Sequence, residues 1–146
     1  MLKIKALLAK ITAKLVTLEA DVSPIGTIVT KQATAAVSMA NETATIVVSI
    51  TLTAGKWLVI GSLQFSSTGT TNCYKSASIN TGSTGSSNIN GKFQVQATGI
   101  TCLSPSRVLT LTGSTQVNLV GVHYYGSSLN TAGGANLPSI TAIRIK

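Results

Sequence analysis

Residues 45–65 read TIVVSITLTAGKWLVIGSLQF and contain two consecutive segments with the two-residue period of β-strands. In the first segment, apolar side chains recur at every second position, at Ile46, Val48, Ile50 and Leu52. Ala54 and Gly55 then predict a turn, and the large side chains of the second segment are Trp57, Val59, Leu63 and Phe65. We therefore predict a β-hairpin over these residues.

The strand pattern recurs along most of the chain. Further predicted strands are residues 26–30, 35–39, 74–79, 92–98, 107–112, 116–125 and 139–145. Two stretches rich in Ser, Thr, Gly and Asn, Ser66–Gly91 and Gly126–Asn136, predict exposed loops, the first of them on both sides of the strand at 74–79. About eight short strands with such connections are typical of an antiparallel β-sandwich.

The first 23 residues carry a different period. Large apolar residues are spaced alternately by four and three positions, at Ile4, Leu8, Ile11, Leu15, Leu18 and Val22. This is the heptad repeat of a coiled coil, in which Leu8, Leu15 and Val22 take the a positions and the other three take the d positions. Leucine at a with isoleucine at d favours three or four strands over two. We interpret the six residues as a trimerisation seam.

A helix at a membrane surface and an ordinary core helix remain alternatives for this segment. Leu2, Leu7 and Val16 widen its apolar face, as a membrane-surface helix would. A secretory signal peptide is disfavoured because Lys10 and Lys14 interrupt the apolar run. The helix is expected to end before Pro24, since the residue preceding a proline is displaced from the helical region.

Charge is distributed very unevenly between the two signs. The chain has 11 Lys and Arg residues but only three acids, Glu19, Asp21 and Glu42, for a net charge of +8. No carboxylate side chain occurs from Thr43 onward. Glycoside hydrolysis generally needs two carboxylates, a Ser-His-Asp triad needs an acid beside its histidine, and calcium sites need several anionic oxygens. The composition therefore argues against an enzyme and predicts neither a metal site nor a cofactor.

Two groups of side chains that can carry chemistry have simpler structural interpretations. Cys73 and Cys102 are too few for a thiolate zinc site. We interpret them as small apolar residues on strands, with a disulfide as the open alternative. His123, Tyr124 and Tyr125 are consecutive on a predicted strand, so alternation places Tyr124 on one face and the other two on the opposite face. Core or interface positions are the favoured interpretation.

Residues Ile50–Phe65 together with Ser139–Lys146 resemble the C1q/TNF-like jelly-roll heads of short bacteriophage fibres. The resemblance lies in a strand that ends in an Ala-Gly turn, an aromatic-led strand after it, and a final alternating strand that carries Arg144. Residues 107–111 and 116–125 fit the penultimate strands of that group. The resemblance implies a homotrimeric jelly roll, and the heptads that precede the head agree with it.

The expected fold is mainly β, with residues 1–23 as a coiled-coil stalk or attachment helix and residues 24–146 as an antiparallel jelly-roll head in a homotrimer. The resemblance implies a structural virion protein, a capsid head fibre or a tail fibre, that is assembled in the bacterial cytoplasm and serves host-surface attachment or particle decoration. Its expected partners are two further copies, capsid or tail proteins at the N-terminal helix, and a candidate host glycan or polymer. The alternative is a basic trimeric binder of nucleic acid or of an anionic cell-surface polymer; it is disfavoured because the cations are scattered and aromatic residues are few.

Candidate receptor contacts follow from the topology that the resemblance implies. In such a jelly roll the first and last strands pair, and the stalk leaves from one end of the head. The loops at the opposite end then face outward, and we expect parts of Ser66–Gly91 and Gly126–Asn136 to contribute to that surface. Tyr74 and Lys75 are the predicted contacts within it.

Overall fold

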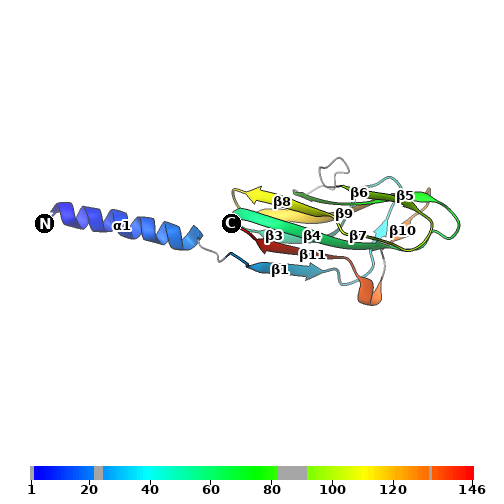
Figure 1. Ribbon diagram of the computed structural model, residues 1–146, viewed down its shortest axis with the longest axis horizontal. Coiled ribbons are helices and arrows are strands. Elements are labelled where there is room, and N and C mark those ends of the chain that lie inside the picture. Colours follow the sequence, from blue (N-terminus) through cyan, green and yellow to red (C-terminus); the bar gives the residue numbers. More distant parts are fainter. Residues whose placement is uncertain (1, 22–24, 82–91, 132) are drawn as a thin grey trace.

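The computed structural model describes residues 2–21, 25–81, 92–131 and 133–146, and it contains one helix followed by a β-sandwich (Figure 1). In chain order the described elements are α1 (Leu2–Asp21), β1 (Ile28–Gln32), β2 (Ser38–Met39), β3 (Thr45–Leu52), β4 (Gly55–Phe65), β5 (Cys73–Thr81), β6 (Phe93–Ala97), β7 (Thr101–Leu103), β8 (Ser106–Leu111), β9 (Thr115–Tyr124), β10 (Leu129–Asn130), the short 3-10 helix η1 (Gly134–Asn136) and β11 (Ser139–Arg144). The chain is therefore mainly β, as the sequence predicts.

Two antiparallel sheets form the sandwich. The five-stranded sheet has the order β1-β11-β4-β7, with β8 also paired to β4, and the four-stranded sheet has the order β3-β9-β5-β6. When β7 and β8 are counted together and the short β2 and β10 are set aside, the eight principal strands have the orders 1-8-3-6 and 2-7-4-5. That order is the double Greek key of a jelly roll. The first and last strands pair, from Ile28 with Ile143 to Gln32 with Ser139, as expected.

The core lies between the two sheets. It includes Trp57, Leu63 and Phe65 of β4 together with residues of β9 and β11 such as Leu119 and Ile140. Two glycines allow the sheets to approach closely. A Cβ atom on Gly61 would lie 2.5 Å from Leu119 Cδ1, and one on Gly121 would lie 2.8 Å from Met39 Sδ. The strands are thus held by interdigitated apolar side chains across the whole layer.

The predicted hairpin over residues 45–65 is wrong, because its two strands lie in different sheets. β3 pairs with β9, whereas β4 pairs with β11, β7 and β8. Residues 53–54 therefore form a corner that crosses the sandwich. Trp57 Nε1 donates a hydrogen bond to the Thr53 carbonyl at 3.0 Å, and Gly55 has a positive φ of 140° beside the guanidinium of Arg144. Both strands keep their apolar side chains in the core without pairing with each other.

The other predicted strands are present, with changed lengths. The segment at 35–39 shortens to the two residues of β2, which pairs with β10. β5 is longer than predicted, and β7 and β10 were not predicted. Residues 82–91, the second part of the predicted loop Ser66–Gly91, lie outside the described part of the chain.

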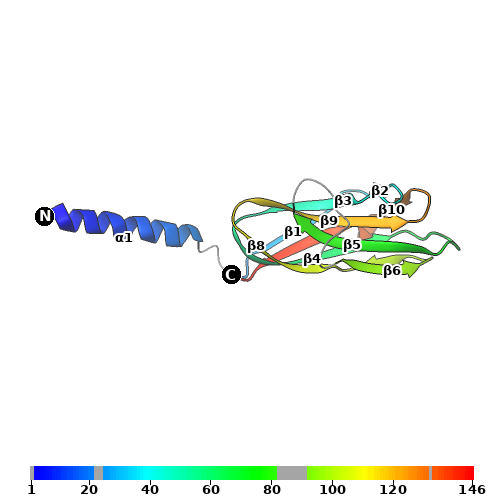
Figure 2. The same cartoon turned by 90° about the horizontal axis from the view of Figure 1, so that it is seen from above.

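Helix α1 lies outside the sandwich, at the end of the sheet where β1 begins and β11 ends (Figures 1 and 2). It ends at Asp21, before Pro24, as predicted. Twenty residues correspond to a length of about 30 Å. From residue 4 to residue 14, the part of α1 whose side chains are described, every residue is exposed. No helix in the described part of the chain is long and apolar enough to cross a membrane.

Candidate functional site

The end of the sandwich opposite α1, which we call the distal end, is formed by the loops at residues 66–72, 98–100 and 125–128 (Figure 1). Backbone hydrogen bonds connect these loops to their surroundings. Thr68 N donates to the Thr98 carbonyl at 2.8 Å, and Ser66 N donates to the Asn130 carbonyl at 3.0 Å. The distal end is therefore a set of connected loops on a rigid sheet, which is a usual setting for binding residues.

Tyr74 lies at the start of β5, next to this end, and its side chain is on the outer face of the four-stranded sheet. Its cross-strand neighbours are Tyr124 on β9 and Gln96 on β6. All three residues are exposed, Tyr74 by 46% and Tyr124 by 41%. They form an uncharged row of two aromatic rings and one amide.

Lys75 does not reach the surface, and its prediction as a surface contact is wrong. It is fully buried, because it has the same strand parity as Ala77 and Ile79, which lie in the core. Its Nζ donates to the Gly99 carbonyl at 2.6 Å, the Ser66 carbonyl at 3.2 Å and Thr101 Oγ1 at 3.3 Å. Lys75 thus connects β5 by hydrogen bonds to two loops of the distal end.

Burial sets the electrostatic state of this lysine. Removal from water lowers the pKa of the Lys75 ammonium below its usual value, while a smaller electrostatic interaction with the neighbouring Cys73 acts in the opposite direction. Three oxygen acceptors match the three donors of an ammonium group. The buried charge is therefore satisfied by neutral oxygens rather than by an acid.

Sequence reasoning missed the exposed position of Tyr124, although it placed Tyr124 correctly on the opposite face from His123. His123 is fully buried, and its Nε2 lies 2.9 Å from the Met39 carbonyl. Because a carbonyl only accepts, Nε2 carries the proton in this contact. His123 is thus a core residue, as favoured above. The register between β5 and β9 identifies Tyr124 as the neighbour of Tyr74, and a single sequence does not reveal that register.

Neither cysteine forms a disulfide in the structure. Cys73 on β5 is buried and Cys102 on β7 is exposed, and both are free thiols. The interpretation as unpaired residues on strands is therefore confirmed. Among the described residues, no group of three His, Cys, Asp or Glu side chains could hold a metal ion.

The predicted seam on α1 is exposed where its side chains are described. Ile4, Leu8 and Ile11 are exposed by 50% to 64%. Leu15 and Leu18 lie in the helix, but their side chains fall outside the described set, as does Val22 altogether. The seam residues that can be assessed therefore have no apolar cover in the single chain.

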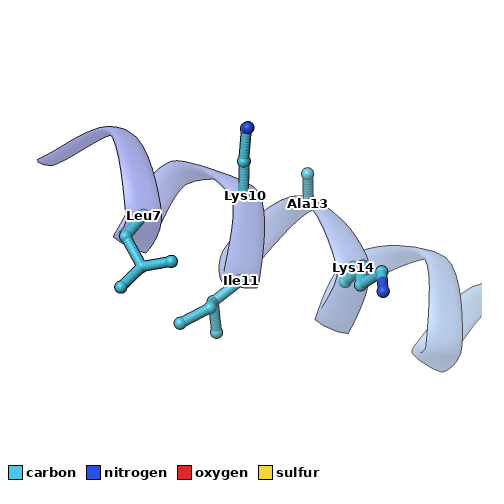
Figure 3. A pocket seen from close by; sticks show the side chains of 5 residues that line it. All are labelled: Leu7, Lys10, Ile11, Ala13 and Lys14. Atoms are coloured by element: carbon cyan, nitrogen blue, oxygen red, sulfur yellow. The ribbon is translucent and has the colours of Figure 1, made fainter. Parts of the chain in front are cut away.

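An open hollow lies along the same helix (Figure 3). It is lined by Leu7, Lys10, Ile11 and Lys14, with Ala13 beside them. Leu7 and Ile11 point to the same side, whereas Lys10 points away (Figure 3). The hollow shares Ile11 with the predicted seam and extends it toward Leu7.

A second hollow lies at the end of the sandwich that is next to α1. It has a volume of about 510 Å³ and is lined by Gly55, Lys56, Thr110, Leu111, Arg144 and Lys146. The Arg144 guanidinium lies over the Trp57 ring, 5.8 Å from its centroid, a cation–π contact. Among the described residues that line this hollow, three side chains are cationic and none is acidic, an arrangement that attracts anions.

Comparisons with known proteins give distant structural similarities. No protein-family model matches the chain, and no curated protein sequence matches it. A structure of infectious bursal disease virus, Gx strain, is 15% identical with a TM-score of 0.46, over 85% of this chain and 39% of that one. The infectious bursal disease virus VP2 subviral particle is 15% identical with a TM-score of 0.42, over 82% of this chain and 37% of that one. The present chain thus spans about two fifths of either.

Proposed function

We propose that this chain is a structural virion protein that assembles as a homotrimeric bacteriophage fibre, with α1 as the stalk or attachment helix and the β-sandwich as the head. One observation carries the proposal. A heptad-bearing helix stands outside a jelly roll, and the described side chains of its seam are exposed. An isolated helix of this length is marginal in water, and other copies of the chain would cover the seam.

The distal end is the proposed attachment surface. Tyr74 and Tyr124 offer two amphipathic rings side by side, and Gln96 adds donors and an acceptor. Tyrosine supplies a large contact area at a small cost in side-chain entropy. An uncharged surface of this kind fits a neutral glycan or polymer on the host cell. Three copies on one rigid trimer would bind together, with an avidity gain of about 10² to 10⁴ where receptor spacing permits.

Binding of fluorescently labelled protein to host cells tests the attachment surface. We expect the double variant Tyr74→Ala and Tyr124→Ala to lose at least about tenfold in bound protein, because two of three contact residues per chain are removed. Phe93→Ala is the matched control, since Phe93 is another exposed aromatic on the edge strand of the same sheet. Unchanged binding of the double variant would place recognition elsewhere. Absence of the protein from purified virus particles would contradict the virion role itself.

The second candidate, a binder of anionic polymers, is favoured by the cationic hollow of Lys56, Arg144 and Lys146. The distinguishing measurement is the affinity for duplex DNA at about 150 mM salt and its decrease as salt rises. We expect only weak retention. Micromolar affinity that is lost in Lys56→Gln with Lys146→Gln would instead favour the polymer binder over the fibre.

A further inference from the structure

The only acidic residue in the sequence of the head, residues 24–146, lies beside the row of exposed tyrosines. This residue is Glu42, and the other two acids of the chain are on α1. Glu42 is exposed, and its backbone N–H donates to the His123 carbonyl at 2.9 Å. That carbonyl belongs to the peptide that joins His123 to Tyr124. The strand order β3-β9-β5-β6 places the turn of Glu42, which leads into β3, on one side of Tyr124 and places Tyr74 on the other.

A chain of hydrogen bonds holds the Glu42 carboxylate at the distal end. Asn41 Nδ2 donates to Glu42 Oε1 at 3.3 Å. The Oδ1 atom of the same amide accepts from the backbone N–H groups of Tyr125 at 2.8 Å and Gly126 at 2.9 Å. Asn41 therefore connects this turn to the distal loop that follows β9. A carboxylate has about four acceptor positions, so the bond from Asn41 leaves acceptor capacity for a ligand.

The backbone of Glu42 has an uncommon conformation. Its φ is 58°, and it is the only non-glycine residue with a positive φ in the part of the chain that the structure describes. Glycine, asparagine or aspartate usually occupies this left-handed region. A glutamate therefore opposes the conformation of its own turn. A residue held in such a conformation is a candidate for a function of its side chain.

We propose that Glu42 and Tyr124 form a subsite for a neutral sugar, an inference that rests on the attachment role proposed above. The Tyr124 ring stacks against the apolar C–H face of a pyranose. The Glu42 carboxylate accepts hydrogen bonds from two adjacent hydroxyl groups of the same sugar, and bonds to an ionised acceptor are roughly twice as strong as bonds between neutral groups. Tyr74 and Gln96 continue the row and contact the next sugar of the chain.

Charge favours a neutral ligand over an ionic one. Four of the 11 Lys and Arg residues lie on α1, which leaves seven in residues 24–146 against the single acid Glu42. This excess repels a cationic polymer as it approaches the head. The Glu42 carboxylate in turn repels an anionic group at the subsite. The ligand class is therefore a neutral pyranose with two adjacent free hydroxyl groups.

Amide NMR spectra of the full chain test the subsite. The probes are the methyl pyranosides of glucose, galactose, mannose and N-acetylglucosamine, each titrated through the millimolar range. We expect at least one of them to shift the signals of Glu42 and Tyr124 together. Glu42→Gln keeps the size of the side chain and removes its charge, so we expect this variant to bind the same sugar at least about fivefold more weakly. Glu19→Gln, the same substitution on α1, is the matched control with unchanged affinity.

Three results would overturn the inference. The first is that no probe sugar shifts the signals of Glu42 and Tyr124. The second is that Glu42→Gln binds the sugar as tightly as the wild type does. The third is that tetramethylammonium shifts the same signals at lower concentrations than any of the sugars, because the subsite would then select a cation.

Glu42→Gly separates a binding role from a structural one. Glycine adopts a φ of 58° without strain, so we expect this variant to melt at or above the temperature of the wild type and still to bind the sugar at least about fivefold more weakly. A lower melting temperature with full sugar affinity would contradict the inference. Binding to host cells distinguishes this inference from the attachment role. If the double variant Tyr74→Ala and Tyr124→Ala loses host binding while Glu42→Gln retains it fully, the attachment surface stands and the sugar subsite at Glu42 is wrong.

Discussion

At the scale of single residues, Lys75 shows how charge and strand period can conflict in a sequence. Its charge indicated a surface position, but Cys73, Lys75, Ala77 and Ile79 share one strand parity and are all buried. The period was the better guide, since alternation along a strand fixes the face of each residue. The acceptors of Lys75 come from residues 66, 99 and 101, and that convergence is a tertiary feature which the sequence does not display.

Replacing Lys75 tests its structural role. We expect Lys75→Met to lower the free energy of unfolding by about 1–3 kcal/mol at neutral pH, because the Ser66 and Gly99 carbonyls lose a donor. Urea denaturation measures the change. A variant as stable as the wild type would show that removing the buried charge offsets the lost hydrogen bonds.

The same pair of proteins tests the lowered pKa of Lys75. The unfolded chain binds this proton up to a pH near the ordinary value of 10.5, whereas the folded chain releases it at lower pH. Within that window the unfolded state holds more protons, so the free energy of unfolding rises with pH. We expect the wild type to gain stability relative to Lys75→Met as pH rises toward 10.5. A difference that stays constant or decreases over the window would contradict the direction of the shift.

Gly61 tests the close approach of the two sheets. A methyl group at this position would overlap Leu119 Cδ1 at 2.5 Å and crowd Ile79 Cδ1 at 3.1 Å. We expect Gly61→Ala to lower the free energy of unfolding by about 1–3 kcal/mol. Gly113→Ala is the control, because nothing lies within 4 Å of its added methyl, and a change within about 0.5 kcal/mol is expected there. Equal effects of the two substitutions would show that the core adapts freely at Gly61.

At the scale of elements, periodicity predicted which segments are strands but not which strands are neighbours. The heptad segment is helical, and β3, β4, β5, β9 and β11 lie where alternation indicated. The partner of each strand depends on contacts far away along the chain, and an Ala-Gly turn is compatible with both a hairpin and a corner between sheets. Strands of two or three residues, β7 and β10, are too short to show a period.

The seam of α1 is the element whose role is easiest to test. We expect Leu8→Asp with Leu15→Asp to separate the helices, because carboxylates at a positions would be buried without partners. The sedimentation coefficient, measured at several concentrations, and the helical circular dichroism signal should both decrease. Ala6→Asp with Ala13→Asp is the matched control at f positions, which face away from an a/d seam. Equal losses in both variants would show that the a/d assignment is incorrect.

At the scale of the whole molecule, the composition argued against some classes of function but did not identify the candidate site. The lack of carboxylates after Glu42 argued against hydrolytic chemistry from the sequence alone. Tyr74 was placed on the surface correctly, whereas its pairing with Tyr124 depends on the register between distant strands. Surfaces built from several strands are therefore the part of this protein that sequence reasoning could not assemble.

The most direct test of the account is the mass of the intact protein in solution. The seam of α1 and the proposed avidity of the head both require three chains in one assembly. Light scattering of the full chain across a micromolar dilution series should give three times the chain mass of 14.9 kDa. A mass of one chain throughout that series would contradict the account.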